Sequence, residues 1–339
     1  MTGISASAPV ASVRRLSAEL AAGRGAVPLL ADVSFDIGSG ETVALVGESG
    51  SGKSLTSLAI MRLLPPAVRI AGGEILFRGR NGAPVDLAAA DERTLQAVRG
   101  AGVGMVFQEP MTALNPAFTI GSQIAETIQL HRGASKAQAW GEAGELLAQV
   151  GIAEPMRRLR EFPHQLSGGM RQRVVIAMAV ACRPALLIAD EPTTALDVTT
   201  QAQVLGVLRA LQAASGMGVL FITHNLALAS MVADRVLVMY AGRIVEAGPA
   251  ASLLQAPRHP YTRALLECLP TRHLPRDRAA WAPLPTIEGP LARPAQGAAG
   301  CAFAPRCALA AAACRDSPTP LRPLEGGERL SRCLRAEVL

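Results

Sequence analysis

Short apolar runs alternate with amphipathic stretches along the first 250 residues of the chain. Runs rich in Val, Ile and Leu predict β-strands at 29–37, 41–47, 72–79, 101–108, 185–190, 218–223 and 235–248. Apolar residues recur at helical spacing within 121–159, 170–182 and 199–215. Strands that alternate with helices indicate an α/β fold with a mainly parallel sheet.

The pattern changes after Gly248. Prolines become frequent from Pro257 to Pro294, and few periodic segments remain. This texture predicts a linker that enters a small, loop-rich C-terminal module. We therefore divide the chain into a main domain at 1–255 and an extension at 256–339. Half of the residues are hydrophobic, which is enough for a large core.

Composition and apolar patterning predict the cellular compartment of the protein. No apolar run reaches the roughly 20 residues that a membrane-spanning helix needs, and the N-terminus lacks the pattern of a signal peptide. The chain is therefore predicted to be cytosolic, where disulfides rarely persist. The formal charge of +6 fits a solvated basic surface, with an acidic membrane face or a nucleic acid as alternatives. Only two of the 33 basic residues are lysines, Lys53 and Lys136, which suggests that Arg would not serve at position 53.

Lys53 lies in the stretch "GESGSGKS", which fits a phosphate-binding loop between a strand and a helix. Its glycines let backbone N–H groups surround phosphate oxygens, and the helix N-terminus adds positive potential. Lys53 would reach the β- and γ-phosphates as a compact charge, and Ser54 would offer a hydroxyl to Mg²⁺. The predicted nucleotide-binding residues are Gly47, Glu48, Ser49, Gly50, Ser51, Gly52, Lys53 and Ser54.

Three further strands end on polar residues. The run "ALLIADEP" places Asp190 at a strand end, where it could hold Mg²⁺, and Glu191 next to it, where it could take a proton from an attacking water. His224 follows "VLFIT" and could reach a γ-phosphate, while Gln108 ends the run at 101–108. We expect Gly47, Gln108, Asp190 and His224 to meet at one edge of the sheet.

The stretch "LSGGMRQR" at 166–173 predicts a second anion-binding helix N-terminus, formed by Ser167, Gly168 and Gly169. The chain has no second phosphate loop for it to serve. A head-to-tail dimer solves this, because each chain's Ser-Gly-Gly turn would then cover the nucleotide bound by its partner.

Taken together, these motifs resemble the ATP-binding subunit of an ABC transporter over about 12–248. The matching elements are the phosphate loop, the glutamine loop at Gln108, the signature motif at 166–170, "LLIADEP", "TALD" ending at Asp197, and the switch histidine His224. The stretches "GESGSGKS", "FQEPMTALNP" and "HPYTRALL" are similar to those of the oligopeptide, dipeptide and nickel importer subfamily. The resemblance implies a P-loop ATPase fold with an antiparallel β subdomain and a helical subdomain.

The resemblance also implies chemistry and partners. ATP with Mg²⁺ would bind at Lys53 and Ser54, with Asp190 and Gln108 completing the metal and water environment. Glu191 would act as the base and His224 would position the water, while Asp197 belongs to the nucleotide site. The expected partners are a second ATPase subunit, expected to be a paralogue, two transmembrane permeases and a solute-binding protein. The subunit would sit peripherally on the cytoplasmic face of the inner membrane.

Two other functions remain open on the sequence. A nickel importer shares the subfamily, although its ATPase commonly ends sooner, so peptides are favoured. ABC-type heads of DNA-repair proteins carry long coiled coils or zinc modules between phosphate loop and signature, whereas Ser54 to Leu166 here leaves room only for compact parts. No nucleic-acid partner is therefore expected.

One position departs from the family pattern. An aromatic residue near the N-terminus usually stacks on adenine, and Leu20 stands where that aromatic is expected. Stacking on a base contributes about 1–3 kcal/mol. Its loss predicts weaker ATP binding or relaxed base selectivity.

Four cysteines gather in the extension, at Cys301, Cys307, Cys314 and Cys333. Clustered thiols in the cytosol favour a metal over disulfides. Zinc ribbons prefer close Cys-x-x-Cys pairs, which this region lacks. The wider gaps are compatible with a [4Fe–4S] cluster, which some members of the resembling family carry here. Zinc and free buried thiols remain the alternatives.

Overall fold

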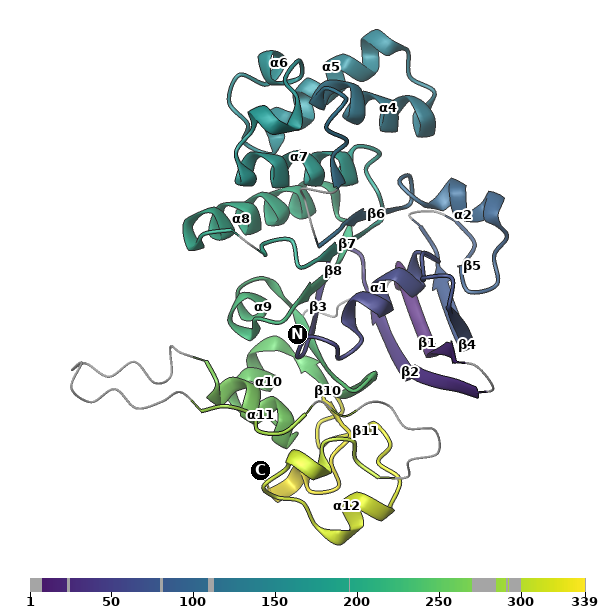
Figure 1. Cartoon of the computed structure of the whole chain (residues 1–339), viewed down its shortest axis with the longest axis vertical. Helices are drawn as coiled ribbons and strands as arrows, with labels where there is room; N and C mark the ends of the chain where they lie inside the picture. The colour runs from purple at the N-terminus through teal and green to yellow at the C-terminus, as the bar shows by residue number, and fades with distance from the viewer. Residues whose placement is uncertain are drawn as a thin grey trace, which may run out of the picture.

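The structure is a computed structural model, and it describes residues 8–22, 25–79, 82–108, 113–194, 196–269, 285–290, 292 and 300–338. Figure 1 shows three parts arranged around one central sheet: helices α4 to α7 at the top, an antiparallel sheet at the right, and the C-terminal module at the bottom. The strands and helices predicted from the apolar pattern all form, with shifted ends.

The central sheet is mixed, with strand order β11-β12-β10-β9-β3-β8-β7-β6. Its parallel part consists of β3 (Thr42–Val46), β6 (Val103–Val106), β7 (Leu186–Asp190), β8 (Gly218–Thr223) and β9 (Arg235–Tyr240). Its antiparallel end consists of β10 (Arg243–Pro249), β11 (Arg322–Pro323) and β12 (Leu330–Ser331). The extension therefore adds two strands to the sheet of the main domain.

Alternate residues of the parallel strands enter two different cores. In β3, Ala44 and Val46 pack on the side of the helices, whereas Val43 and Leu45 pack on the side of the antiparallel sheet. All of them are fully buried. Burial on both faces explains why these strands are continuous apolar runs with no polar alternation.

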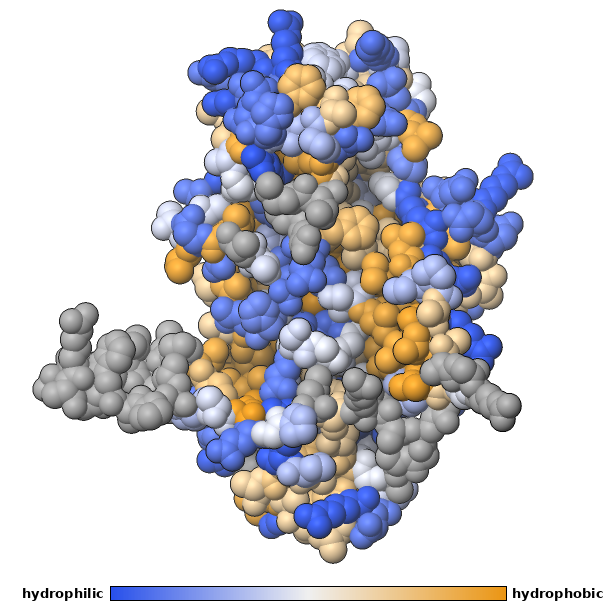
Figure 2. Space-filling view, viewed as in Figure 1, coloured by the Kyte–Doolittle hydropathy of each residue, from blue (hydrophilic) through white to orange (hydrophobic). Residues whose placement is uncertain are grey.

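The smaller sheet is antiparallel, with order β2-β1-β4-β5. It comprises β1 (Ala11–Ala22), β2 (Gly25–Ile37), β4 (Val68–Phe77) and β5 (Val85–Asp86). Leu20 lies in the central strand β1, opposite Val27 of β2 and Val68 of β4. In Figure 2, apolar residues gather over this sheet and α1, whereas hydrophilic residues dominate over the helical end at the top.

The long helical segment predicted at 121–159 is three helices. They are α4 (Ile120–Arg132), α5 (Lys136–Gln149) and α6 (Pro155–Arg158). Gly133 ends α4 in a left-handed conformation, and Ser135 with Gln138 forms a capping box that starts α5. These local signals divide the helical region into separate helices.

The remaining helices cover the central sheet and its ends. They are α1 (Lys53–Ile60), α2 (Glu92–Val98), α7 (Gly168–Val180), α8 (Val198–Ser215), α9 (Leu226–Val232), α10 (Ala250–Gln255), α11 (Pro260–Glu267) and α12 (Ala312–Asp316). Within the described part of the chain, no helix has the length and apolar character needed to cross a membrane.

Candidate functional site

The phosphate loop connects β3 to α1 and wraps around its own lysine. The ammonium of Lys53 donates to the carbonyl oxygens of Gly47 at 2.9 Å and Glu48 at 3.0 Å. A Cβ at Gly47 would overlap the Met239 carbonyl oxygen of β9, and Gly52 has φ 109°, so both positions require glycine. Burial lowers the pKa of Lys53, and the nearby carboxylates oppose this effect. The loop is thus a close-packed cradle around one cation.

Asp190 meets the first turn of α1. The Ser54 hydroxyl donates to one carboxylate oxygen of Asp190 at 3.1 Å, and the Ser57 hydroxyl donates to the other at 3.4 Å. The Asp190 residue is only 3 % exposed, and this burial raises the pKa of its carboxyl group. A hydroxyl and a carboxylate held side by side are oxygen ligands of the kind that Mg²⁺ prefers. Two of the three residues predicted to hold the metal, Ser54 and Asp190, therefore contact each other.

Glu191 and His224 form a pair at the ends of adjacent strands. His224 Nδ1 lies 3.1 Å from a carboxylate oxygen of Glu191, and the Thr194 hydroxyl donates to the same oxygen at 2.9 Å. The Glu191 backbone has φ 47°, and its N–H donates to the Ile222 carbonyl of β8. His224 remains 58 % exposed at its side chain. The carboxylate is therefore fixed in place while the imidazole faces solvent.

The sequence placed four strand ends at one sheet edge, and the structure confirms this arrangement. Strands β3, β8, β7 and β6 are parallel neighbours in that order, so Gly47, His224, Asp190 and Gln108 all follow carboxyl ends at the same edge. Gln108 lies two residues beyond β6 and is exposed. Ligands of open α/β sheets bind at this edge.

The Ser-Gly-Gly turn begins α7 and packs against the start of α8. The Ser167 hydroxyl accepts from the Met170 N–H at 3.3 Å, and Ser167 itself is exposed. A Cβ at Gly169 would come 2.6 Å from the Thr200 methyl group, and Thr200 in turn donates to Asp197 at 2.7 Å. Across the residues that the structure describes, no hydrogen bond links this turn to the phosphate loop of the same chain. The turn and Asp197 thus form a separate, open surface.

Sequence reasoning missed several residues of the site. Ser57 lies one helical turn after Ser54, and this spacing could have revealed it. Thr194 lies within "TALD" but was given no contact with Glu191. Tyr261 lies within "HPYTRALL" but was given no contact with the phosphate loop, and no local pattern marks Arg306; both contact Glu48.

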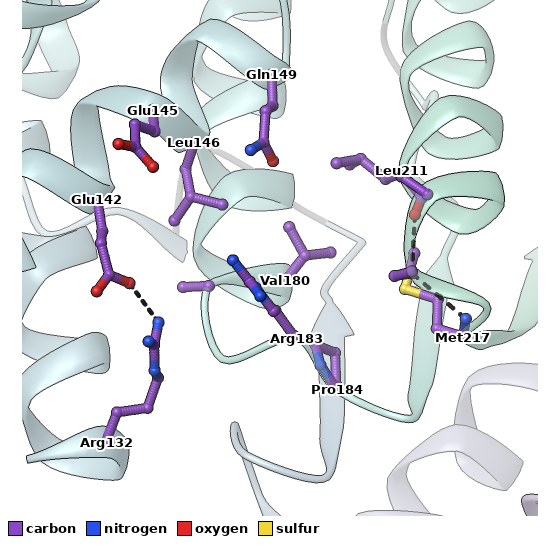
Figure 3. A pocket seen from close by; sticks show the side chains of 13 residues that line it. Arg132, Glu142, Glu145, Leu146, Gln149, Val180, Arg183, Pro184, Leu211 and Met217 are labelled. Atoms are coloured by element: carbon purple, nitrogen blue, oxygen red, sulfur yellow. Dashed lines mark hydrogen bonds and ion pairs between the residues drawn. The ribbon is translucent and has the colours of Figure 1, made fainter. Parts of the chain in front are cut away.

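A cavity of about 790 Å³ lies elsewhere, between α5, α7 and α8. Figure 3 shows Arg132 of α4 paired with Glu142 of α5 at one side, and Leu211 and Met217 at the other. None of its lining residues belongs to the phosphate loop or to the strand ends described above. The space is therefore not the predicted nucleotide site.

The four clustered cysteines converge on one small cavity in the C-terminal module. Cys301, Cys307, Cys314 and Cys333 line it together with His259. Burial raises the pKa of Cys301, Cys307 and Cys333, that of Cys333 to about 11, so these thiols are protonated at neutral pH. In the described portion of the chain, no group of three or more His, Cys, Asp or Glu side chains is arranged to hold a metal ion. The predicted metal at these cysteines is thus unsupported by the geometry.

Two family models match this chain, one in the main domain and one that covers much of the extension. Residues 30–194 match the ABC transporter model. Residues 245–314 match the model described as the oligopeptide/dipeptide transporter C-terminal region. The second match covers Cys301, Cys307 and Cys314 and the segment that carries Arg306.

Similar proteins and solved structures agree with the family-model match to an ABC transporter. The chain is 54 % identical over 306 residues to a putative peptide import ATP-binding protein of Brucella melitensis, covering 90 % of each. It is 54 % identical over 245 residues to the glutathione import ATP-binding protein of Salmonella typhimurium, covering 72 % of this chain and 39 % of that one. A dimeric ATP-binding cassette in a post-hydrolysis state, bound to ADP and Pi, matches with TM-score 0.61 and 28 % identity, covering 71 % of this chain and 98 % of that one.

Proposed function

This chain belongs to the ATP-binding subunits of ABC transporters, and on that premise we propose that it powers the import of di- and oligopeptides. One observation carries the proposal. The region that matches the oligopeptide-transporter C-terminal model shares the central sheet with the phosphate loop. The matched region at 245–314 begins within β10, a strand of the sheet that holds the phosphate loop, and β12, which follows the matched region, pairs with β10. Peptide import ATP-binding relatives over nine-tenths of the chain support the substrate class.

The phosphate loop would hold the nucleotide. The backbone N–H groups of 47–54 and the Lys53 ammonium would neutralise the phosphates. Ser54 and Asp190 would hold Mg²⁺, with Gln108 reaching the same edge from β6. The bound ion would supply charge stabilisation to the transferring phosphoryl group.

Glu191 would take a proton from the attacking water, and His224 would help to orient that water. The contact with His224 and the hydrogen bond from Thr194 hold one carboxylate oxygen of Glu191, which leaves the other oxygen to accept the proton. The side chain is only 11 % exposed, so few alternative water positions compete. A positioned general base of this kind accelerates a reaction by about 10²–10⁴-fold.

The open Ser167–Gly169 turn supports pairing with a second ATPase subunit. An exposed helix N-terminus with free N–H groups would close on the nucleotide bound by that partner. The similar solved cassette is itself dimeric. A paralogous partner, two permeases and a solute-binding protein would complete the importer, with this subunit on the cytoplasmic face of the inner membrane. Phe107 and Phe118, 41 % and 55 % exposed beside Gln108 and α4, would contact the permeases.

The four cysteines would hold a [4Fe–4S] cluster. Four cysteines are the ligand set of such a cluster. The buried imidazole of His259 beside them also supports the proposal. The Tyr261 N–H donates to His259 Nδ1, so the ring hydrogen lies on Nε2, which is buried without a partner beside the thiols. The proposal rests on this donor set and this orphaned imidazole. Zinc ribbons prefer close Cys-x-x-Cys pairs, which the spacing of these four cysteines does not provide.

Iron analysis tests the cluster. Protein purified anaerobically should contain about four iron and four sulfide per chain and should show an absorbance shoulder in the blue part of the visible spectrum. Cys314→Ser should lower both contents. Stoichiometric zinc, or no metal at all, would overturn this assignment.

Transport by the reconstituted complex tests the main function. Partner subunits are captured from membranes on the tagged chain, and the complex is placed in proteoliposomes. We expect dipeptides or oligopeptides to stimulate ATP hydrolysis and to be taken up, and Lys53→Ala to abolish both. Uptake of nickel without stimulation by peptides would contradict the assigned substrate.

A further inference from the structure

Two side chains of the C-terminal segment form hydrogen bonds with one residue of the phosphate loop. Arg306 donates to both carboxylate oxygens of Glu48, at 2.9 and 3.1 Å. The hydroxyl of Tyr261 accepts from the backbone N–H of Glu48 at 2.9 Å. Glu48 follows Gly47 directly, and its carbonyl oxygen accepts from Lys53. The extension thus contacts the loop at the residue that the catalytic lysine also contacts.

Arg306 is held in a fixed orientation. Besides Glu48, its guanidinium donates to the carbonyl oxygens of Glu288 at 2.9 Å and Ile287 at 2.8 Å, and to the Tyr240 hydroxyl at 3.3 Å. The guanidinium has five N–H donors and makes five hydrogen bonds, and the side chain is only 6 % exposed. A bidentate pair in which the arginine is buried and uses every donor is a positioned contact, unlike an ion pair between two exposed side chains.

Aromatic rings pack closely around the pair. Tyr240, Tyr261 and Phe303 pack against one another with ring centroids 4.6 and 5.3 Å apart. Arg306 ends the short helical turn at Ala304–Arg306, between Cys301 and Cys307 of the cysteine cavity. The guanidinium is therefore anchored to the same segment as two of the clustered thiols.

The charge of Glu48 matters because its neighbours are expected to bind a polyanion. An unpaired carboxylate in a phosphate loop repels phosphate, and a repulsion over a few ångströms changes affinity by roughly tenfold. Glu48 is close enough to act on Lys53 electrostatically. Arg306 neutralises this carboxylate and draws it toward the extension by a bidentate contact.

We propose that Arg306 is a positioning residue for ATP binding, which neutralises Glu48 and thereby couples the C-terminal module to the phosphate loop. The proposal rests on the proposed role of this loop as the nucleotide site. It gives the extension a task in the ATPase cycle, because any rearrangement of the 301–307 segment would release a negative charge beside the phosphates.

Nucleotide affinity in a double-mutant cycle tests the proposal. The full-length chain is titrated with a fluorescent ATP analogue and Mg²⁺ in four forms: wild type, Arg306→Gln, Glu48→Gln and the double variant. We expect Arg306→Gln to raise Kd by about tenfold. The double variant should return to within about twofold of Glu48→Gln, because no carboxylate remains to be neutralised. Steady-state kinetics should show the same change in KM, with kcat nearly unchanged.

Two outcomes would overturn the proposal: an unchanged Kd in Arg306→Gln, or a double variant as weak as Arg306→Gln alone. Arg315→Gln, an exposed arginine of the same module, is the matched control and should leave Kd unchanged. Melting temperatures confirm that each variant is folded. Lys53→Ala distinguishes a failure of the proposed nucleotide site from a failure of the proposed role of Arg306. If this variant still binds nucleotide, the proposed site itself is wrong, whatever Arg306→Gln does.

Discussion

The Ser54 hydroxyl donates a hydrogen bond of 3.1 Å to the Asp190 carboxylate, across 136 residues of sequence. This contact joins the first turn of α1 to the end of β7. It brings a phosphate-loop hydroxyl and a buried carboxylate to the place where a nucleotide-bound cation would sit. The central chemistry of the subunit therefore depends on two strand ends being neighbours.

Asp190 makes the nucleotide-free protein pH-sensitive. Burial raises the pKa of its carboxyl group, so the folded state holds its proton more tightly than the unfolded chain does. Its contribution to the free energy of unfolding therefore decreases as pH rises above the ordinary carboxyl value. We expect Asp190→Asn to remove this decrease and to raise Tm at pH 7 by about 1–3 °C. Calorimetry between pH 4 and 8 measures it.

Asp190→Asn should also be stabilised less than the wild type by ATP and Mg²⁺. With ATP and Mg²⁺ present, Tm of the wild type should rise much more than Tm of Asp190→Asn, because the cation loses its carboxylate. An Asp190→Asn protein that is less stable than the wild type without nucleotide at pH 7 would contradict the account.

Glu191→Gln should separate binding from hydrolysis. The amide keeps the shape of the side chain but cannot accept the proton, so phosphate release should fall by about 10²-fold or more. Kd for ATP should stay near the wild-type value, since Glu191 follows the strand rather than the phosphate loop. The exposed Glu337→Gln is the matched control. Substantial turnover by Glu191→Gln would remove this residue from the role of base.

Glu246 and Arg329 join the extension to the central sheet. Glu246 in β10 is fully buried and accepts from Arg329 at 2.7 Å and from the Arg258 N–H at 2.7 Å. We expect Arg329→Met to lower the free energy of unfolding by about 3 kcal/mol in urea denaturation, because a buried carboxylate loses its counter-charge.

The defect in Arg329→Met should shrink at low pH. Burial already raises the pKa of Glu246, so its protonation relieves the unpaired charge. Adding Glu246→Gln should restore most of the lost stability at pH 7. Equal destabilisation at pH 5 and pH 8 would argue that the contact acts by packing and not by charge.

Leu20→Tyr should restore a stacking surface for the base. Leu20 is half-buried in β1, the strand predicted to carry the adenine-stacking aromatic. We expect ATP affinity to rise by about fivefold or more, which corresponds to the lower part of the range for base stacking. Leu130→Tyr, at a position in α4 that is 77 % exposed, is the control. If the affinities for ATP and GTP both stay constant in Leu20→Tyr, the interpretation of this position is wrong.

The sequence alone determined the parallel strands and the longer helices, and it predicted the nucleotide residues, because each depends on local information. The apolar runs of β3, β7 and β8 identify buried strands, and the order of Gly and Lys in 47–54 identifies a loop that can surround phosphate. The edge that collects Gly47, Gln108, Asp190 and His224 followed from the parallel direction of those strands. The clustered cysteines were likewise visible as a sequence feature before their shared cavity was known.

Only the tertiary structure decided the contacts between distant segments. Arg306 and Glu48 are separated by 258 residues, and neither has a local pattern that names the other. The sequence predicted a separate C-terminal module because the pattern of the chain changes after Gly248, yet β12 pairs with β10 and extends the main sheet. Backbone hydrogen bonds and buried charges choose their partners by spatial proximity, and proximity across hundreds of residues is set by how the whole chain packs.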